Sequence, residues 1–148
     1  MDFRESMIHE RYKLVTSRQL YLVDLTKDTF ASYARTLAAF VAGTITLVSA
    51  AEKLSLSQAV VLDLILAIAV FLSFAASISV AQILFCIKRW YEYRAAECKI
   101  NPDAPRAEWW ACLFEAMYAA AILGSIGLVW WGYFYLGATV GKVATSTT

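Results

Sequence analysis

Three long stretches without charged residues dominate the hydropathy pattern of this chain. Residues 36–51, 64–87 and 116–141 contain no Asp, Glu, Lys or Arg and comprise 16, 24 and 26 residues. A helix rises about 1.5 Å per residue and the hydrocarbon core is about 30 Å thick, so about 20 residues cross it. The first stretch reaches this length if Arg35 extends its guanidinium toward the headgroups. We predict an all-α integral membrane protein with transmembrane helices at 34–51, 64–87 and 109–135; a buried or re-entrant helix is the alternative for the first.

The segment before the first span, residues 1–33, has a helical pattern of its own. It contains no glycine or proline. At 100° per residue one side is largely apolar, although Arg11 and Arg18 intrude on it. The pattern predicts a cytoplasmic amphipathic helix that lies on lipid or, because its polar face carries balanced charges, packs on protein. Its apolar side comprises Ile8, Tyr12, Val15, Leu22, Phe30 and Tyr33.

The connections between the spans are short, so we treat residues 1–148 as a single membrane domain. The turn before the second span is too short to form a domain, and Ser57 is a candidate N-cap. Residues 88–98 contain no helix breaker and should continue the second helix into a loop that occupies 88–108. The sequence Asn-Pro-Asp-Ala-Pro at 101–105 predicts a turn. Residues 136–148 form the predicted tail, and its end, 141–148, is polar.

Composition agrees with a bilayer as the main partner of this chain. Apolar residues make up 60 % of the 148 residues and charged residues 17 %, against about 45–50 % and about 25 % in soluble domains. The net charge is +1, which provides no basic excess for a phosphate backbone. We therefore expect no binding to nucleic acid.

Lysine and arginine predict the orientation. The segments before, between and after the three spans carry six, one, five and one of these residues in turn. Positively charged loops stay in the cytoplasm, so the N-terminus and the 88–108 loop should be cytoplasmic and the C-terminus outside. This corresponds to an inner (plasma) membrane, or to the mitochondrial inner membrane with its matrix side taking the cytoplasmic place. The Trp109–Trp110 and Trp130–Trp131 pairs lie about 31 Å apart along a helix, which matches two interfaces of one bilayer.

Each predicted span carries small residues at intervals of four. Lipid provides no hydrophobic force between helices, so close approach of small side chains drives their association. The pattern therefore predicts tight helix contacts, either within one chain or in a homo-oligomer or larger membrane complex. The residues concerned include Ala38 and Ala42, Ser73 and Ser77, and Ala120 and Gly124.

Glu115 is the candidate site residue of the sequence. It follows Trp109 by six residues, about 9 Å down the third span, where a carboxylate is costly unless it is paired, protonated or hydrated. Lys88 and Arg89, at the inner end of the second span, are the candidate partners in an interfacial ion pair. Alternatively Glu115, with Glu108 seven residues earlier, lines a hydrated inner vestibule that binds a proton or cation.

Motifs for catalysis or cofactor binding are sparse. The chain has a single histidine, His9, which excludes bis-histidine haem and HExxH zinc sites, and it has no Walker A or GxGxxG sequence. We therefore expect no cofactor, no metal and no enzymatic activity. The sequence favours a non-enzymatic oligomeric scaffold or accessory subunit of a membrane complex. The alternative is a homo-oligomeric pore or membrane-permeabilising effector with Glu115 in its inner vestibule.

Overall fold

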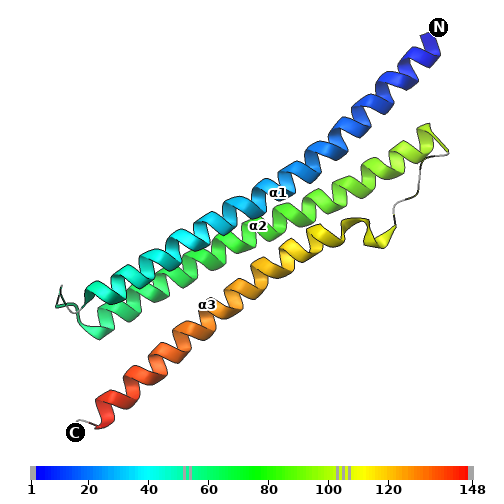
Figure 1. Cartoon of the computed structure of the whole chain (residues 1–148). Helices are drawn as coiled ribbons and strands as arrows, with labels where there is room; N and C mark the ends of the chain where they lie inside the picture. Colours follow the sequence, from blue (N-terminus) through cyan, green and yellow to red (C-terminus); the bar gives the residue numbers. More distant parts are fainter. Residues whose placement is uncertain are drawn as a thin grey trace.

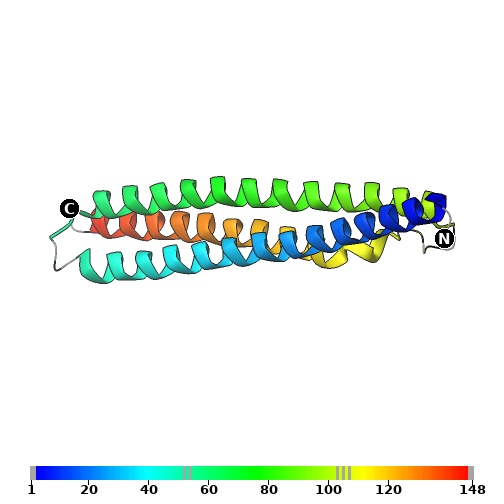
Figure 2. The same ribbon diagram turned by 90° about the horizontal axis from the view of Figure 1, so that it is seen from above.

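A computed structural model of the chain describes residues 3–51, 53, 55–102, 104, 106 and 108–146. These residues form three long helices, α1 (Phe3–Ala51), α2 (Gln58–Ile100) and α3 (Leu113–Ser146), with a 3-10 turn, η1 (Trp109–Cys112), directly before α3. Each helix runs antiparallel to the one before it, and the two ends of the chain lie at opposite ends of the bundle (Figures 1 and 2). All three helices are long and apolar enough to cross a membrane. The prediction of an all-helical membrane protein with three spans is confirmed at this level.

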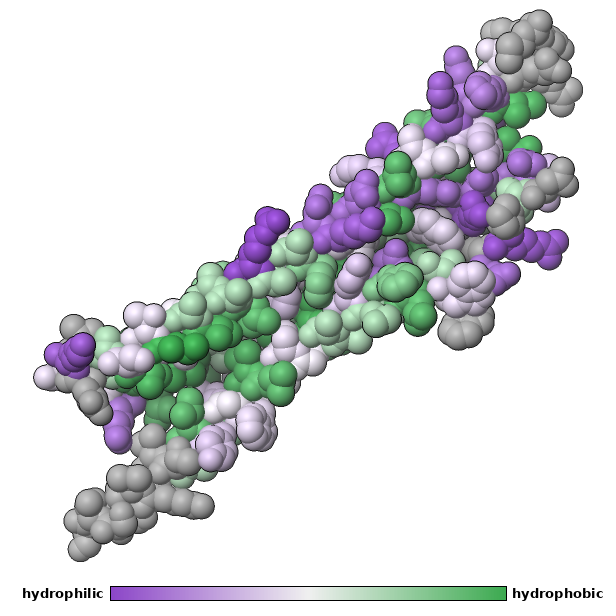
Figure 3. All heavy atoms as spheres, in the orientation of Figure 1, coloured by the Kyte–Doolittle hydropathy of each residue, from purple (hydrophilic) through white to green (hydrophobic). Residues whose placement is uncertain are grey.

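Two of the helices are much longer than a bilayer requires. At about 1.5 Å per residue, the 49 residues of α1 extend about 73 Å and the 43 residues of α2 about 64 Å, against a hydrocarbon core of about 30 Å. Charged and polar residues gather over the N-terminal half of α1 and the neighbouring end of α2, and apolar residues over the other half (Figure 3). The α1–α2 hairpin therefore has an apolar part of bilayer length and a polar extension.

The predicted amphipathic helix at 1–33 is not supported. No break separates it from the first span, and the single helix α1 contains an apolar segment long enough to cross a membrane. Leu22 and Tyr33 of the predicted apolar side are buried, but Gln19 and Thr26 on the same side are buried too. Ile8 and Tyr12 of the predicted apolar side are exposed, and so are other large apolar side chains of the same segment: Met7, Leu14, Leu20 and Tyr21.

Other boundaries follow local chemistry. Ser57 caps α2 as predicted, because its hydroxyl accepts a hydrogen bond from the Val60 amide. α2 runs to Ile100, so the continued helix predicted over 88–98 is confirmed and occupies more than half of the predicted loop. Asn101 is the C-cap of this helix and directly precedes Pro102, which disfavours a helical residue before it. The predicted tail at 136–148 is helical as far as Ser146, and its last two residues lie outside the described part.

The helices pack with a coiled-coil spacing, in which inward-facing residues alternate in steps of three and four. The deepest layers contain Tyr33 of α1, Ala76 and Ile83 of α2, and Ala119 and Ile122 of α3. In this register the bundle interior continues beyond the apolar segments. On α1 the inward positions are Val15, Gln19, Leu22, Thr26, Thr29 and Tyr33, and on α2 they run from Ile65 to Glu97.

The predicted stripes of small residues do not close this bundle. Ala38 and Ala42 on α1 are exposed, and so are Ala120 and Gly124 on α3. On α2, Ser77 is exposed. Ser73 is half-buried, and its hydroxyl accepts a hydrogen bond from Trp130 Nε1 at 3.0 Å. The small-residue faces of α1 and α3 therefore point outward from the single chain, whereas Ala69 and Ala76 of α2 are buried in the bundle.

Candidate functional site

The candidate carboxylate, Glu115, is half-buried at the end of the bundle where α3 begins. It is on the first turn of α3, three residues after Cys112 of η1. Together with residues of α1 and α2 it lines a small cavity of about 10 Å³, which is near the space that one water molecule requires. The other lining residues are Leu22, Val23, Thr26, Cys86, Ile87, Trp90 and Cys112.

One oxygen of this carboxylate has no partner. Oε2 of Glu115 is buried and accepts no hydrogen bond from the described residues. The Thr26 hydroxyl in the same cavity already donates to the Leu22 carbonyl oxygen at 3.0 Å, as threonine commonly does within helices. Glu115 is therefore half-buried, with one carboxylate oxygen directed into the interior of the bundle.

The predicted ion pair between Glu115 and Lys88 or Arg89 is not formed. Lys88 is exposed, and Arg89 pairs with Glu92 at 2.8 Å on the outer surface of α2. The reason is the helical register: Cys86, Ile87 and Trp90 line the cavity, so Lys88 and Arg89 lie on the opposite side of α2. Glu108 does not join Glu115 either, because it is exposed and precedes the 3-10 turn, which breaks the seven-residue spacing.

A second polar cluster, which the sequence reasoning missed, joins α1 to the far end of α2. Glu97 is 4 % exposed, and its Oε2 accepts hydrogen bonds from Arg94 Nη1 at 2.6 Å and Gln19 Nε2 at 3.0 Å. The Arg94 guanidinium also lies over the Trp90 ring. We call Gln19, Arg94 and Glu97 the polar clasp. A sequence signal for this cluster exists: the inward positions of α2 alternate in steps of three and four, and continuing this spacing past Ile87 makes Glu97 an inward position.

The electrostatics of the clasp favour the charged carboxylate. Glu97 lies ten residues beyond the apolar stretch 64–87, about 15 Å outside it. Burial alone raises the pKa of Glu97, but the hydrogen bonds from Gln19 and Arg94, the charge of Arg94 and the Tyr12 hydroxyl outweigh it, so the net pKa is lowered. The clasp therefore holds an ionised glutamate in the helix interface.

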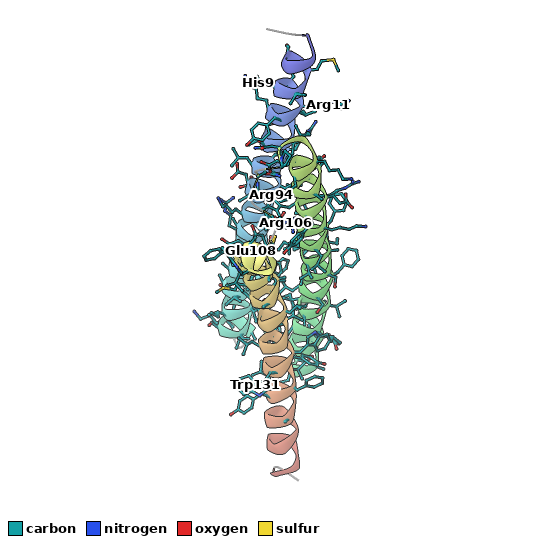
Figure 4. All side chains as sticks on the ribbon, turned by 90° about the vertical axis from the view of Figure 1, so that its right-hand side faces the viewer. His9, Arg11, Arg94, Arg106, Glu108 and Trp131 are labelled. Atoms are coloured by element: carbon teal, nitrogen blue, oxygen red, sulfur yellow. The ribbon has the colours of Figure 1, made fainter. Side chains whose placement is uncertain are left out.

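Elsewhere in the described chain the polar groups are structural. All three cysteines are free thiols, and no group of three or more His, Cys, Asp and Glu side chains in the described residues lies close enough to hold a metal ion. His9 and Arg11 lie on the part of α1 that extends past the end of α2 (Figure 4). The polar clasp and the Glu115 cavity thus place polar side chains between the helices at two levels of the bundle.

Comparison with known proteins gives no family for this chain. No protein-family model, no curated protein and no solved structure matches it significantly.

Proposed function

We propose that this chain is a non-enzymatic integral membrane protein that works by association, as a homo-oligomeric scaffold or an accessory subunit of a membrane complex. The observation that carries this proposal is the outward direction of the small-residue faces. On α1 the face comprises Ala38, Ala42 and Thr46, and on α3 it comprises Ala116, Ala120, Gly124 and Gly127, all of them exposed.

The glycines strengthen this argument. A Cβ atom added at Gly124 or Gly127 would meet nothing within 4 Å, so packing within the chain does not require glycine there. Glycine within a helix is costly relative to alanine, and in membranes it is favoured where another backbone approaches closely. A neighbouring helix from a second copy or another subunit supplies such an approach.

The proposed location is an inner (plasma) membrane, or a mitochondrial inner membrane, with the N-terminus on the cytoplasmic or matrix side. The alternation of Lys and Arg along the chain supports this orientation, and the polar extension of α1 and α2 then lies on the inner side. Epitope tags at the two ends test it in sealed inside-out vesicles. The N-terminal tag should be removed by added protease and the C-terminal tag protected; the opposite result would reverse the orientation.

Association is tested with purified protein in lipid nanodiscs, by native mass spectrometry and single-molecule photobleaching. Wild-type protein should form oligomers, or retain partner subunits in mild detergent. Gly124→Leu and Ala38→Leu should shift the population toward the isolated chain, because leucine holds the helices apart. Gly43→Leu is the matched control, since Gly43 is exposed with open space around it but lies outside both faces. A wild-type protein that stays monomeric and partner-free would refute the proposal.

The alternative function, a pore with Glu115 in a shared vestibule, receives less support. Glu115 lies between the helices of one chain, so assembly around an outer axis would not bring copies of it together. Ion flux from liposomes distinguishes the two functions. A scaffold leaves them tight, whereas a pore conducts and changes its conductance in Glu115→Gln.

A further inference from the structure

Gln82 of α2 lies inside an apolar stretch without a hydrogen-bond partner in its own chain. It precedes Ile87, the last residue of the stretch 64–87, by five residues, which is about 7.5 Å of helix. Its side chain is half-buried and forms no hydrogen bond with any of the described residues. A glutamine amide has two N–H donors and a carbonyl acceptor, and polar groups left unpaired in hydrocarbon are costly.

The direction of the helix takes this amide away from the nearer interface. Side chains of a helix lean toward its N-terminus, which in α2 is the end at Gln58. The nearer end of the apolar stretch is the opposite one, at Ile87. Gln82 therefore leans toward the middle of the bilayer, and it does not reach the headgroups as a long side chain near the end of a span does.

The side of α2 around Gln82 is not covered by the other helices of the chain. Ile78 and Phe85 lie about one turn before and after Gln82, and each is 53 % exposed. The buried side of α2 at this level carries Ile83 and Cys86, which face the bundle interior. A partner for the Gln82 amide must therefore come from outside the chain.

The other uncovered region of the apolar half makes a smaller polar demand. Near the middle of the bundle α1 and α3 are in contact, because the Phe30 and Tyr118 rings stack at 4.6 Å and the Tyr33 hydroxyl bonds to Ser125 at 2.8 Å. Beyond this level α3 diverges from the α1–α2 hairpin (Figure 1), and the space between α1 and α3 is lined mostly by aliphatic and aromatic side chains. We call this space the apolar groove. The Thr44 and Ser125 hydroxyls in its lining donate to carbonyl oxygens of their own helices.

Depth and chemistry together favour a second copy of this chain as the partner of Gln82. Copies that insert with the same orientation carry Gln82 at the same depth, so a twofold axis along the membrane normal can bring two of these side chains together. The amide is also self-complementary, because each N–H can donate to the carbonyl oxygen of the other copy. Glutamine side chains form such hydrogen bonds between helices in membranes.

We propose that α2 forms a homodimer contact in which the Gln82 amides of two copies bond to each other, with Ile78 and Phe85 packed around them. This inference rests on the association proposed above and assigns one contact of it to a second copy. The contact uses α2, whereas the small-residue faces lie on α1 and α3, so the two can be tested separately.

The test measures dimerisation of full-length protein in liposomes, by energy transfer between differently labelled copies over a range of protein-to-lipid ratios. Gln82→Leu should weaken dimerisation several-fold, and Gln82→Asn, which keeps an amide, should weaken it less. Ser77→Ala is the matched control. It removes an exposed polar group of the same helix, but the Ser77 hydroxyl already donates to the Ser73 carbonyl oxygen at 2.8 Å, so dimerisation should not change.

Cysteine cross-linking locates the contact in a variant whose three native cysteines are replaced by alanine. On oxidation with copper phenanthroline, Ile78→Cys should give a disulfide-linked dimer. Leu84→Cys should not, because Leu84 is similarly exposed, at 55 %, but lies on the opposite side of α2 from Gln82. Dimers that Gln82→Leu leaves as stable as wild type, or that cross-link through Leu84→Cys and not Ile78→Cys, would refute the Gln82 contact. If Gly124→Leu dissociates those same dimers, the proposed function still stands.

Discussion

The polar clasp and the apolar groove lie toward opposite ends of the same bundle and show two ways in which helices pair. At the clasp, α1 and α2 approach closely around an ionised Glu97 held by Arg94 and Gln19. At the groove, α1 and α3 diverge and leave space lined by aliphatic side chains. The first contact is specific and requires its partners, whereas the second has a polar contact between α1 and α3 only at its edge, where Tyr33 bonds to Ser125.

The comparison teaches where the register of this bundle is set. Buried ion pairs are weak evidence for stability, because desolvation offsets much of the attraction, but one mispositioned partner leaves a charge uncompensated. The clasp therefore penalises any shift of α1 along α2. In the apolar half, lipid solvates the helices as well as their neighbours do, so small gaps between helices cost little free energy.

The largest effect is expected from removal of the clasp carboxylate. Glu97→Ala leaves Arg94 largely buried without its partner, and breaking a buried pair in this way costs about 3–5 kcal/mol. Hydrogen exchange should show reduced protection in residues 12–26 of α1, while the apolar half remains protected. Loss of protection at both ends alike would mean that the two regions are not independent.

Glu92→Ala is the matched control for this change. Arg89 and Glu92 form a pair of the same type and spacing on the same helix, but both side chains are about half exposed. Exposed pairs contribute about 0–1 kcal/mol. Protection near the clasp should therefore stay close to that of the wild type.

Acid should loosen the clasp selectively, with a smaller effect than Glu97→Ala because a neutral glutamic acid keeps its volume. The pKa of Glu97 is lowered in the folded protein, so its contribution to stability is present above the unfolded value, about 4.3, and is lost as the pH falls through the folded value. Protection factors of residues 12–26, corrected for intrinsic exchange, should stay constant from neutral pH to about 4.3 and fall as the pH is lowered further. Glu97→Gln should lack this step; if it retains the step, another group is responsible.

The smallest effect is expected for the hydrogen bond at the inner boundary of the groove. Interhelical hydrogen bonds within membranes contribute about 0.6 kcal/mol on average and up to about 1.7 kcal/mol. Tyr33→Phe and Ser125→Ala should each lower the free energy of unfolding by about this amount. A double-mutant cycle of the two changes, measured by unfolding in mixed micelles, should give a coupling energy different from zero. A coupling energy of zero would show that the Phe30–Tyr118 stack alone limits the separation of α1 and α3.

The sequence predicted where the helices lie along the chain better than which side of each helix faces its neighbours. The spans, the Ser57 cap and the extension of α2 past Lys88 follow from charge spacing, cap chemistry and the absence of breakers. The amphipathic helix at 1–33 was not supported, because the helix that contains it is itself apolar enough to cross a membrane. The partner of Glu115 was wrong, because proximity along the membrane normal says nothing about which side of α2 Arg89 occupies.

The sequence by itself determined how many helices can cross a bilayer, because run length and hydropathy are measured against the fixed thickness of the hydrocarbon core. The tertiary structure alone decided which side of each helix faces its neighbours. Leucine on lipid and leucine in the bundle differ little in free energy, so hydropathy carries no signal that separates the two. For that reason the sequence could not predict that Ala38 and Gly124 face outward and Glu97 faces inward. The groove between α1 and α3 could likewise be found only in three dimensions.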